Sequence, residues 1–171
     1  MKLVFREHPF SSLRSYRVYD ENERLAFVVK NKPALGRFLR ICDTDGREVA
    51  CLKEHAFTYP AEFEMHLNDR YVGERYLGHV TLEEDFCYRS YAISCNGWRI
   101  ETEVESGGQT IVAPNGKVVA FIEWGQPIFG RYTVTVLNED DVPTVLMYAL
   151  TVAIMHRRWR QNRRWYRRYY W

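Results

Sequence analysis

Residues 142–155, VPTVLMYALTVAIM, form an apolar run with no period-two alternation and no internal turn residue, which predicts a helix. Asp141 is placed to cap this helix, and Pro143 falls in the first turn, where proline is tolerated. Such a helix is about 21 Å long, whereas a membrane span needs about 20 residues. The run is therefore too short to cross a bilayer. Because it is apolar nearly all round, it must be surrounded by other parts of the chain.

The rest of the chain predicts antiparallel strands. Residues 61–69 (AEFEMHLND), 98–105 (WRIETEVE) and 131–138 (RYTVTVLN) alternate apolar and polar side chains, the pattern of half-buried strands. Turn signals recur at short intervals: DENE at 20–23, DTDG at 43–46, CNG at 95–97, SGG at 106–108 and PNG at 114–116. This spacing favours a meander or barrel of about ten to twelve strands.

A barrel of about twelve strands has a lumen too wide for its own side chains to fill. A helix threaded through that lumen would fill it and would hide its own apolar circumference. We therefore predict a mainly β fold, a closed antiparallel barrel of about twelve strands around a central hydrophobic C-terminal α-helix at about 142–156. Residues 1–156 would form a single domain, and 157–171 a basic aromatic tail.

Several pieces of the chain, in this order and spacing, carry a family resemblance. They are YRVYDENERLAFVV, LRICDTDGREVACLKEHAFTYPAEFEMHLNDRYVGE, CNGWRIETEV, APNGKVVAFIEWGQPIFGRYTVTVLNEDDVP and VLMYALTVAI. From about Tyr16 to about His156 the chain resembles the LURP-one-related family, which shares the tubby C-terminal-like fold with tubby proteins and phospholipid scramblases. The resemblance implies the same barrel around a central helix, and it implies no particular activity, because the family has no general assigned one.

Two features depart from these relatives. The family usually ends soon after its central helix, whereas here an Arg/Trp/Tyr segment follows His156. The chain also shows neither the palmitoylated cysteine cluster of scramblases nor a separate tail anchor, so scrambling activity is not carried over. No Lys/Arg constellation in the body of the sequence matches the phosphoinositide-binding residues of tubby proteins.

The cysteines predict reduced, buried thiols. None of the four cysteines shows CxxC spacing, and the N-terminal sequence has no long apolar segment typical of secretion. Cys42 and Cys51 flank the turn at 43–46 and fall on one face, about one diagonal apart. We expect them to be small core residues rather than a disulfide. A cytoplasmic location is expected, peripheral to a membrane if the tail binds one.

The sequence predicts no enzyme, because it contains no GxSxG, HExxH or glycine-rich phosphate loop. Glu62, Glu64 and His66 share one strand face, and the glutamates of 101–105 form a similar stripe that would suit calcium. Residues at i, i+2 and i+4 of a strand spread along a face rather than converging on one point. We therefore predict solvated faces, with no catalytic residues, no metal and no cofactor.

The tail, residues 157–171, holds seven arginines and no acid, whereas the remaining chain holds 17 basic and 22 acidic residues. Three interpretations stay open: a solubilising continuation of the helix, an interfacial anchor on anionic lipid, and a nucleic-acid arm, which the acidic body disfavours. The residues expected to bind lipid are Arg157, Arg158, Trp159, Arg160, Arg163, Arg164, Trp165 and Arg167.

The leading functional prediction is a non-enzymatic binding or scaffold module that associates peripherally with anionic membrane lipids through this tail, with a protein as a further kind of partner. One alternative is a small-ligand-binding protein or enzyme with a pocket at the barrel mouth. A further alternative is nucleic-acid contact by the tail.

Overall fold

The computed structural model describes the chain at residues 1–7, 15–56, 58, 62–84, 89–93, 95, 97–102, 108–124 and 131–154. These residues form twelve strands, a 3-10 turn and a C-terminal helix. The strands are β1 (Lys2–Glu7), β2 (Tyr16–Tyr19), β3 (Leu25–Ala34), β4 (Gly36–Cys42), β5 (Glu48–Glu54), β6 (Glu62–Asp69), β7 (Gly73–Glu84), β8 (Arg89–Ile93), β9 (Arg99–Thr102), β10 (Gln109–Val112), β11 (Val118–Trp124) and β12 (Tyr132–Val136).

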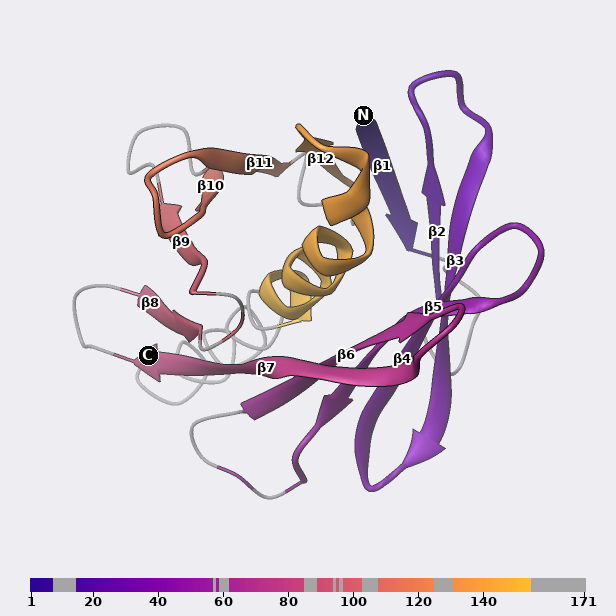
Figure 1. The fold of residues 1–171 in the computed structure, drawn as a ribbon, viewed down its shortest axis with the longest axis horizontal. Helices are drawn as coiled ribbons and strands as arrows, with labels where there is room; N and C mark the ends of the chain where they lie inside the picture. Colours follow the sequence, from indigo (N-terminus) through magenta and orange to yellow (C-terminus); the bar gives the residue numbers. More distant parts are fainter. Residues whose placement is uncertain are drawn as a thin grey trace, which may run out of the picture.

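All twelve strands belong to one antiparallel sheet, in the order β8-β7-β6-β5-β4-β3-β2-β1-β12-β11-β10-β9. Strands that are consecutive in sequence pair with each other, except β8 and β9, and β1 also pairs with β12, which brings the two halves of the chain together. The sheet curls around the C-terminal helix (Figure 1). The prediction of a mainly β, antiparallel fold with one C-terminal helix is therefore confirmed.

Closure of the barrel is not confirmed. The strands β8 and β9 are the two edges of the sheet, and no backbone ladder joins them among the residues that the structure describes. The structure thus shows a curled sheet, and a hydrogen-bonded ring stays a prediction.

The helix starts through a 3-10 turn, η1 (Glu139–Asp141), which the sequence did not predict. Asn138 caps this turn, and its side-chain oxygen accepts a hydrogen bond from the backbone N–H of Asp140 at 3.4 Å. The cap therefore lies three residues before the expected Asp141. The helical turns of residues 142–154 follow directly, with Pro143 in the first turn as expected.

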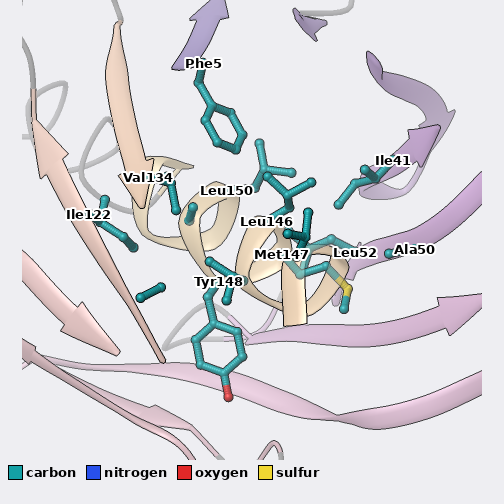
Figure 2. Close-up of a cluster of buried hydrophobic side chains, with 14 of the residues drawn as sticks. Phe5, Ile41, Ala50, Leu52, Ile122, Val134, Leu146, Met147, Tyr148 and Leu150 are labelled. Atoms are coloured by element: carbon teal, nitrogen blue, oxygen red, sulfur yellow. The ribbon is translucent and has the colours of Figure 1, made fainter. Parts of the chain in front are cut away.

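The helix is buried over its whole described length, so the prediction that it needs to be surrounded is confirmed. Every residue from 142 to 154 is buried except Pro143 and Ala153, which are half-buried. Figure 2 shows Leu146, Met147 and Leu150 pointing among side chains from strands far apart in the sheet. No helix in the described part of the chain is long and apolar enough to cross a membrane.

Two buried polar side chains of the helix have hydrogen-bond partners, one in the connection between β8 and β9 and one in the helix itself. The Tyr148 hydroxyl donates a hydrogen bond to the backbone carbonyl of Cys95 at 2.8 Å, and Thr151 Oγ1 donates to the carbonyl of Met147 at 2.9 Å. Burial raises the pKa of Tyr148 well above its ordinary value, so its hydroxyl keeps its proton. The Trp98 ring lies 5.7 Å from the Tyr148 ring, which ties the start of β9 to the helix.

The period-two strands also follow the sequence pattern. Phe63 and Met65 of β6 are fully buried in the core, whereas Glu62, Glu64 and His66 lie on the opposite face. The alternation therefore fixes which side chains meet the helix.

We expect Leu150→Ala to lower the free energy of unfolding by about 2–5 kcal/mol, because it leaves a cavity between the helix and the sheet. Leu35→Ala, at a residue that is 83% exposed, should change it by less than about 0.5 kcal/mol. Urea unfolding measures both values. Equal values for the two variants would show that the helix is not the centre of the core.

Candidate functional site

The face of the sheet turned away from the helix carries two rows of side chains that cross five strands, β3 to β7. The first row, by strand register, is Lys32, Phe38, Lys53, Glu64 and His79. The second row is Lys30, Arg40, Cys51, His66 and Tyr76. Both rows begin with a lysine on β3; the first ends with Glu64 and His79, and the second ends with His66 and Tyr76. We call this region the outer polar face.

The cationic half of the outer polar face belongs to the hairpin of β3 and β4. Residues 30–40 contain four basic side chains and no acid. The Phe38 ring lies between two ammonium groups, 5.6 Å from Lys32 Nζ and 5.7 Å from Lys53 Nζ. Arg40 pairs with Glu48, and the hydrogen bond from that carboxylate raises the pKa of Arg40. The sequence did not reveal this cluster, because its basic residues gather only when β3 folds back on β4.

The other half is a network around His66. Its Nδ1 lies 2.9 Å from Glu74 Oε1, and its Nε2 lies 3.3 Å from Glu64 Oε2. Both contacts become hydrogen bonds only when both ring nitrogens carry protons. His55 Nε2 lies 2.8 Å from the other oxygen of Glu64, and Lys53 Nζ lies 2.7 Å from Glu74 Oε1. The network therefore joins β5, β6 and β7 through contacts of two carboxylates with histidine and lysine side chains.

The carboxylates of this network are held in the ionised form. Burial of Glu64 would raise its pKa, but hydrogen bonds from His66 and His55 outweigh that effect and lower it. The hydrogen bond from Lys53 lowers the pKa of Glu74. Carboxylates that are already paired in this way are poorly suited to proton transfer. The network is best interpreted as a structural ion-pair cluster.

Metal binding finds no support in this network. Within the described ranges, no three His, Cys, Asp or Glu side chains are placed to hold a metal ion. Glu62, Glu64 and His66, which the sequence places on one strand face, do share that face. Glu64 and His66 contact each other and their cross-strand neighbours instead of converging on an empty centre. In the second stripe, the structure describes the side chain of Glu101, which is exposed and pairs with Arg99 at 2.7 Å.

Cys42 and Cys51 are buried free thiols, as expected, and they lie about one diagonal apart on neighbouring strands. They lie on the outer polar face rather than among the side chains that contact the helix. Cys51 faces Arg40 and His66 across the ladders, yet it is 1% exposed because these long polar side chains cover it. Burial raises the pKa of the Cys51 thiol to about 12.

The two ends of the sheet differ in charge. At one end lie the turns at 20–24, 43–47, 69–73, 113–117 and 138–141, which together hold nine acidic and four basic residues. We call this the acidic end. At the other end β3 turns into β4 at Leu35, next to the basic residues of 30–40, and we call it the basic end after this hairpin. Carboxylates also lie at this end, since β5 finishes at Glu54, β6 begins at Glu62 and β7 finishes at Glu84.

The helix connects these two ends. Because β12 runs parallel to β2, it finishes at the acidic end, where the helix begins. The helix stays buried as far as Ile154 and therefore runs inside the sheet toward the basic end (Figure 1). Arg157, Arg158, Trp159, Arg160, Arg163, Arg164, Trp165 and Arg167, the residues predicted to bind lipid, lie outside the described residues.

An antiparallel sheet curled around one buried C-terminal helix agrees with the mainly β fold and central helix that the family resemblance implied, apart from the closure of the barrel. The LURP-one-related family matches residues 1–155, and the chain belongs to this family. A protein from Arabidopsis thaliana, solved by X-ray crystallography, has a similar fold with a TM-score of 0.54. The likeness covers 88% of this chain and 91% of that one at 15% identity, so it concerns the fold alone. Among curated proteins no match was found.

Glu64→Gln should lower the free energy of unfolding at pH 7 by at most about 1 kcal/mol, because the pair is partly solvated. Because the pKa of Glu64 is lowered, ionised Glu64 stabilises the fold at pH values above its ordinary pKa of 4.5. This stabilisation is lost as the pH falls through the lowered pKa. The difference from the wild type should therefore shrink toward pH 3. Urea unfolding at both pH values tests this, with Glu21→Gln in an exposed turn as control. A difference that stays constant with pH would contradict the assignment.

In a Cys87→Ser variant, the three remaining thiols should resist a thiol reagent at pH 8 while the protein is folded. The reason is that Cys42, Cys51 and Cys95 are buried, and burial keeps the Cys51 thiol protonated. All three should react in denaturant, which a colorimetric thiol titration counts. Rapid reaction of one thiol in the folded protein would contradict the burial of these three side chains.

Proposed function

We propose that this protein is a non-enzymatic binding module that docks on anionic membrane surfaces through the basic aromatic tail, residues 157–171. The observation that carries the proposal is the burial of the helix from 142 to 154. The apolar helix is buried inside the sheet and is therefore not available as a membrane anchor. In this proposal the tail, which follows the helix in sequence, is the membrane-binding element.

The composition of the tail suits the boundary of an anionic bilayer. Each arginine near such a surface contributes about 1 kcal/mol of attraction, and tryptophan and tyrosine favour the headgroup region. Arg157, Arg158, Arg160, Arg163, Arg164 and Arg167 would bind headgroups, and Trp159 and Trp165 would insert as wedges. Because anionic lipids enrich the cytoplasmic leaflet, a cytoplasmic, peripheral location goes with this proposal.

The charge of the described body supports one orientation. The acidic end carries the excess of carboxylates, which an anionic surface repels, and the basic end lies at the opposite side of the sheet. A protein that approaches with its basic end first would bring the tail to the surface and would keep the acidic turns in solvent. Nucleic acid is also a polyanion and would experience the same charges of the protein, so binding to nucleic acid is measured together with binding to lipid.

We also infer that β8 and β9 close the barrel around the helix. They are consecutive in sequence, joined through residues 94–98, and each would otherwise leave an open edge. Cys95, within that connection, accepts the hydrogen bond of Tyr148. A closed barrel with the helix inside it leaves little interior space for a small ligand, which disfavours the alternative of an enzyme or ligand carrier.

The full chain should sediment with vesicles rich in phosphatidylserine and should dissociate from them in high salt. It should not bind neutral vesicles. A chain that ends at His156 should lose most of this binding but keep its urea unfolding midpoint, because the described helix is retained. A chain of full length that ignores anionic vesicles would refute the proposal. Stronger capture by single-stranded DNA than by vesicles at equal salt would favour the nucleic-acid alternative instead.

A further inference from the structure

We propose that the turn between β3 and β4 is a second membrane contact, which inserts Leu35 into the anionic bilayer that the tail binds. The inference rests on the proposed function and adds to it a contact in the body of the fold. The tip of this turn is apolar and projects from the sheet: Leu35 is 83% exposed, and Pro33 and Ala34 beside it are also exposed.

The tip is held in a defined position on the sheet. Ala34 pairs with Gly36, so Leu35 alone forms the end of the hairpin. Gly36 has a φ of +94°, and a Cβ at this position would lie 2.6 Å from the backbone carbonyl oxygen of Glu54. The backbone N–H of Arg37 donates a hydrogen bond to Glu54 Oε2 at 3.3 Å. The hairpin is therefore packed against the end of β5, and this packing fixes the direction in which Leu35 projects.

Basic side chains surround the apolar tip. Lys30 and Lys32 are exposed, Arg37 is half-buried, and residues 30–40 contain no acid. The nearest carboxylates already have partners, since Glu54 binds Arg37 and Glu48 binds Arg40. The ammonium groups of Lys30 and Lys32 form no ion pair with the described residues. An apolar tip beside two lysines that form no ion pair with the described residues complements a bilayer with acidic headgroups, in which the cations meet phosphates and the leucine meets acyl chains.

The end of the sheet at which the tip lies agrees with the direction of the buried helix. Leu35 lies at the basic end, toward which the buried helix runs before the tail begins. A second apolar tip, Tyr71 and Val72 between β6 and β7, is 90% and 77% exposed but lies at the acidic end. Residues 30–40 carry four basic side chains and no acid, whereas residues 69–75 carry two basic and two acidic ones. Charge therefore favours the hairpin of Leu35, and Val72 provides a matched control of similar exposure.

An environment-sensitive fluorophore on Leu35→Cys, in a full-length Cys87→Ser background, tests the insertion directly. The label should blue-shift and brighten several-fold on phosphatidylserine vesicles and should not change on neutral ones. The same label on Val72→Cys should stay unchanged on both. A response at Val72→Cys without one at Leu35→Cys would overturn the proposal, because the protein would then dock by its acidic end.

Binding measurements separate this inference from the proposed function. With the tail intact, Leu35→Ser should weaken vesicle partitioning about tenfold, since it removes one buried leucine. Lys32→Glu should weaken it as well, whereas Lys117→Glu, exposed in a turn at the acidic end, should have a much smaller effect. Tail-dependent binding that is unaffected by Leu35→Ser and by Lys32→Glu would refute the hairpin contact and leave the tail proposal standing. Absence of any vesicle binding by the full chain would refute both.

Discussion

The burial of an all-apolar helix inside a curled sheet is the interaction on which the rest of this structure depends. Leu146, Met147 and Leu150 contact side chains from both halves of the sheet, so the helix is the shared core of strands that are distant in sequence. The Tyr148 hydroxyl bound to the Cys95 carbonyl places one polar contact in this core. That contact fixes the rotation of the helix relative to the connection between β8 and β9.

This arrangement separates the remaining surface into regions with different properties. The outer polar face across β3 to β7 is stabilised by paired charges, of which the His66 network is the clearest example, and such pairs suit stability more than chemistry. The acidic end collects the turns that precede β3, β5, β7 and the helix. The basic end presents Leu35 among unpaired lysines. A binding role at the basic end is therefore consistent with how the fold distributes its charges.

Much of this architecture was predictable from local patterns. Period-two alternation identified the inward residues Phe63 and Met65, and the uniform apolarity of 142–155 identified a helix that had to be enclosed. The start of the helix was less predictable, because Asn138 caps a 3-10 turn that no sequence pattern indicated. The burial of Cys51 under polar side chains was also hidden, because alternation assigns a face but cannot show that arginine and histidine cover a thiol there.

By itself, the sequence determined the class of fold and the place of the helix, because hydrophobic periodicity is a local property that each segment carries independently. It also determined the charge contrast between the body and the tail. Only the tertiary structure decided which distant residues meet. The pairing of β4 with β3 and β5 places Lys32 and Lys53 beside Phe38, and the pairing of β1 with β12 sets the direction in which the helix runs. These outcomes depend on strand register and topology, which arise from long-range contacts that no single segment encodes.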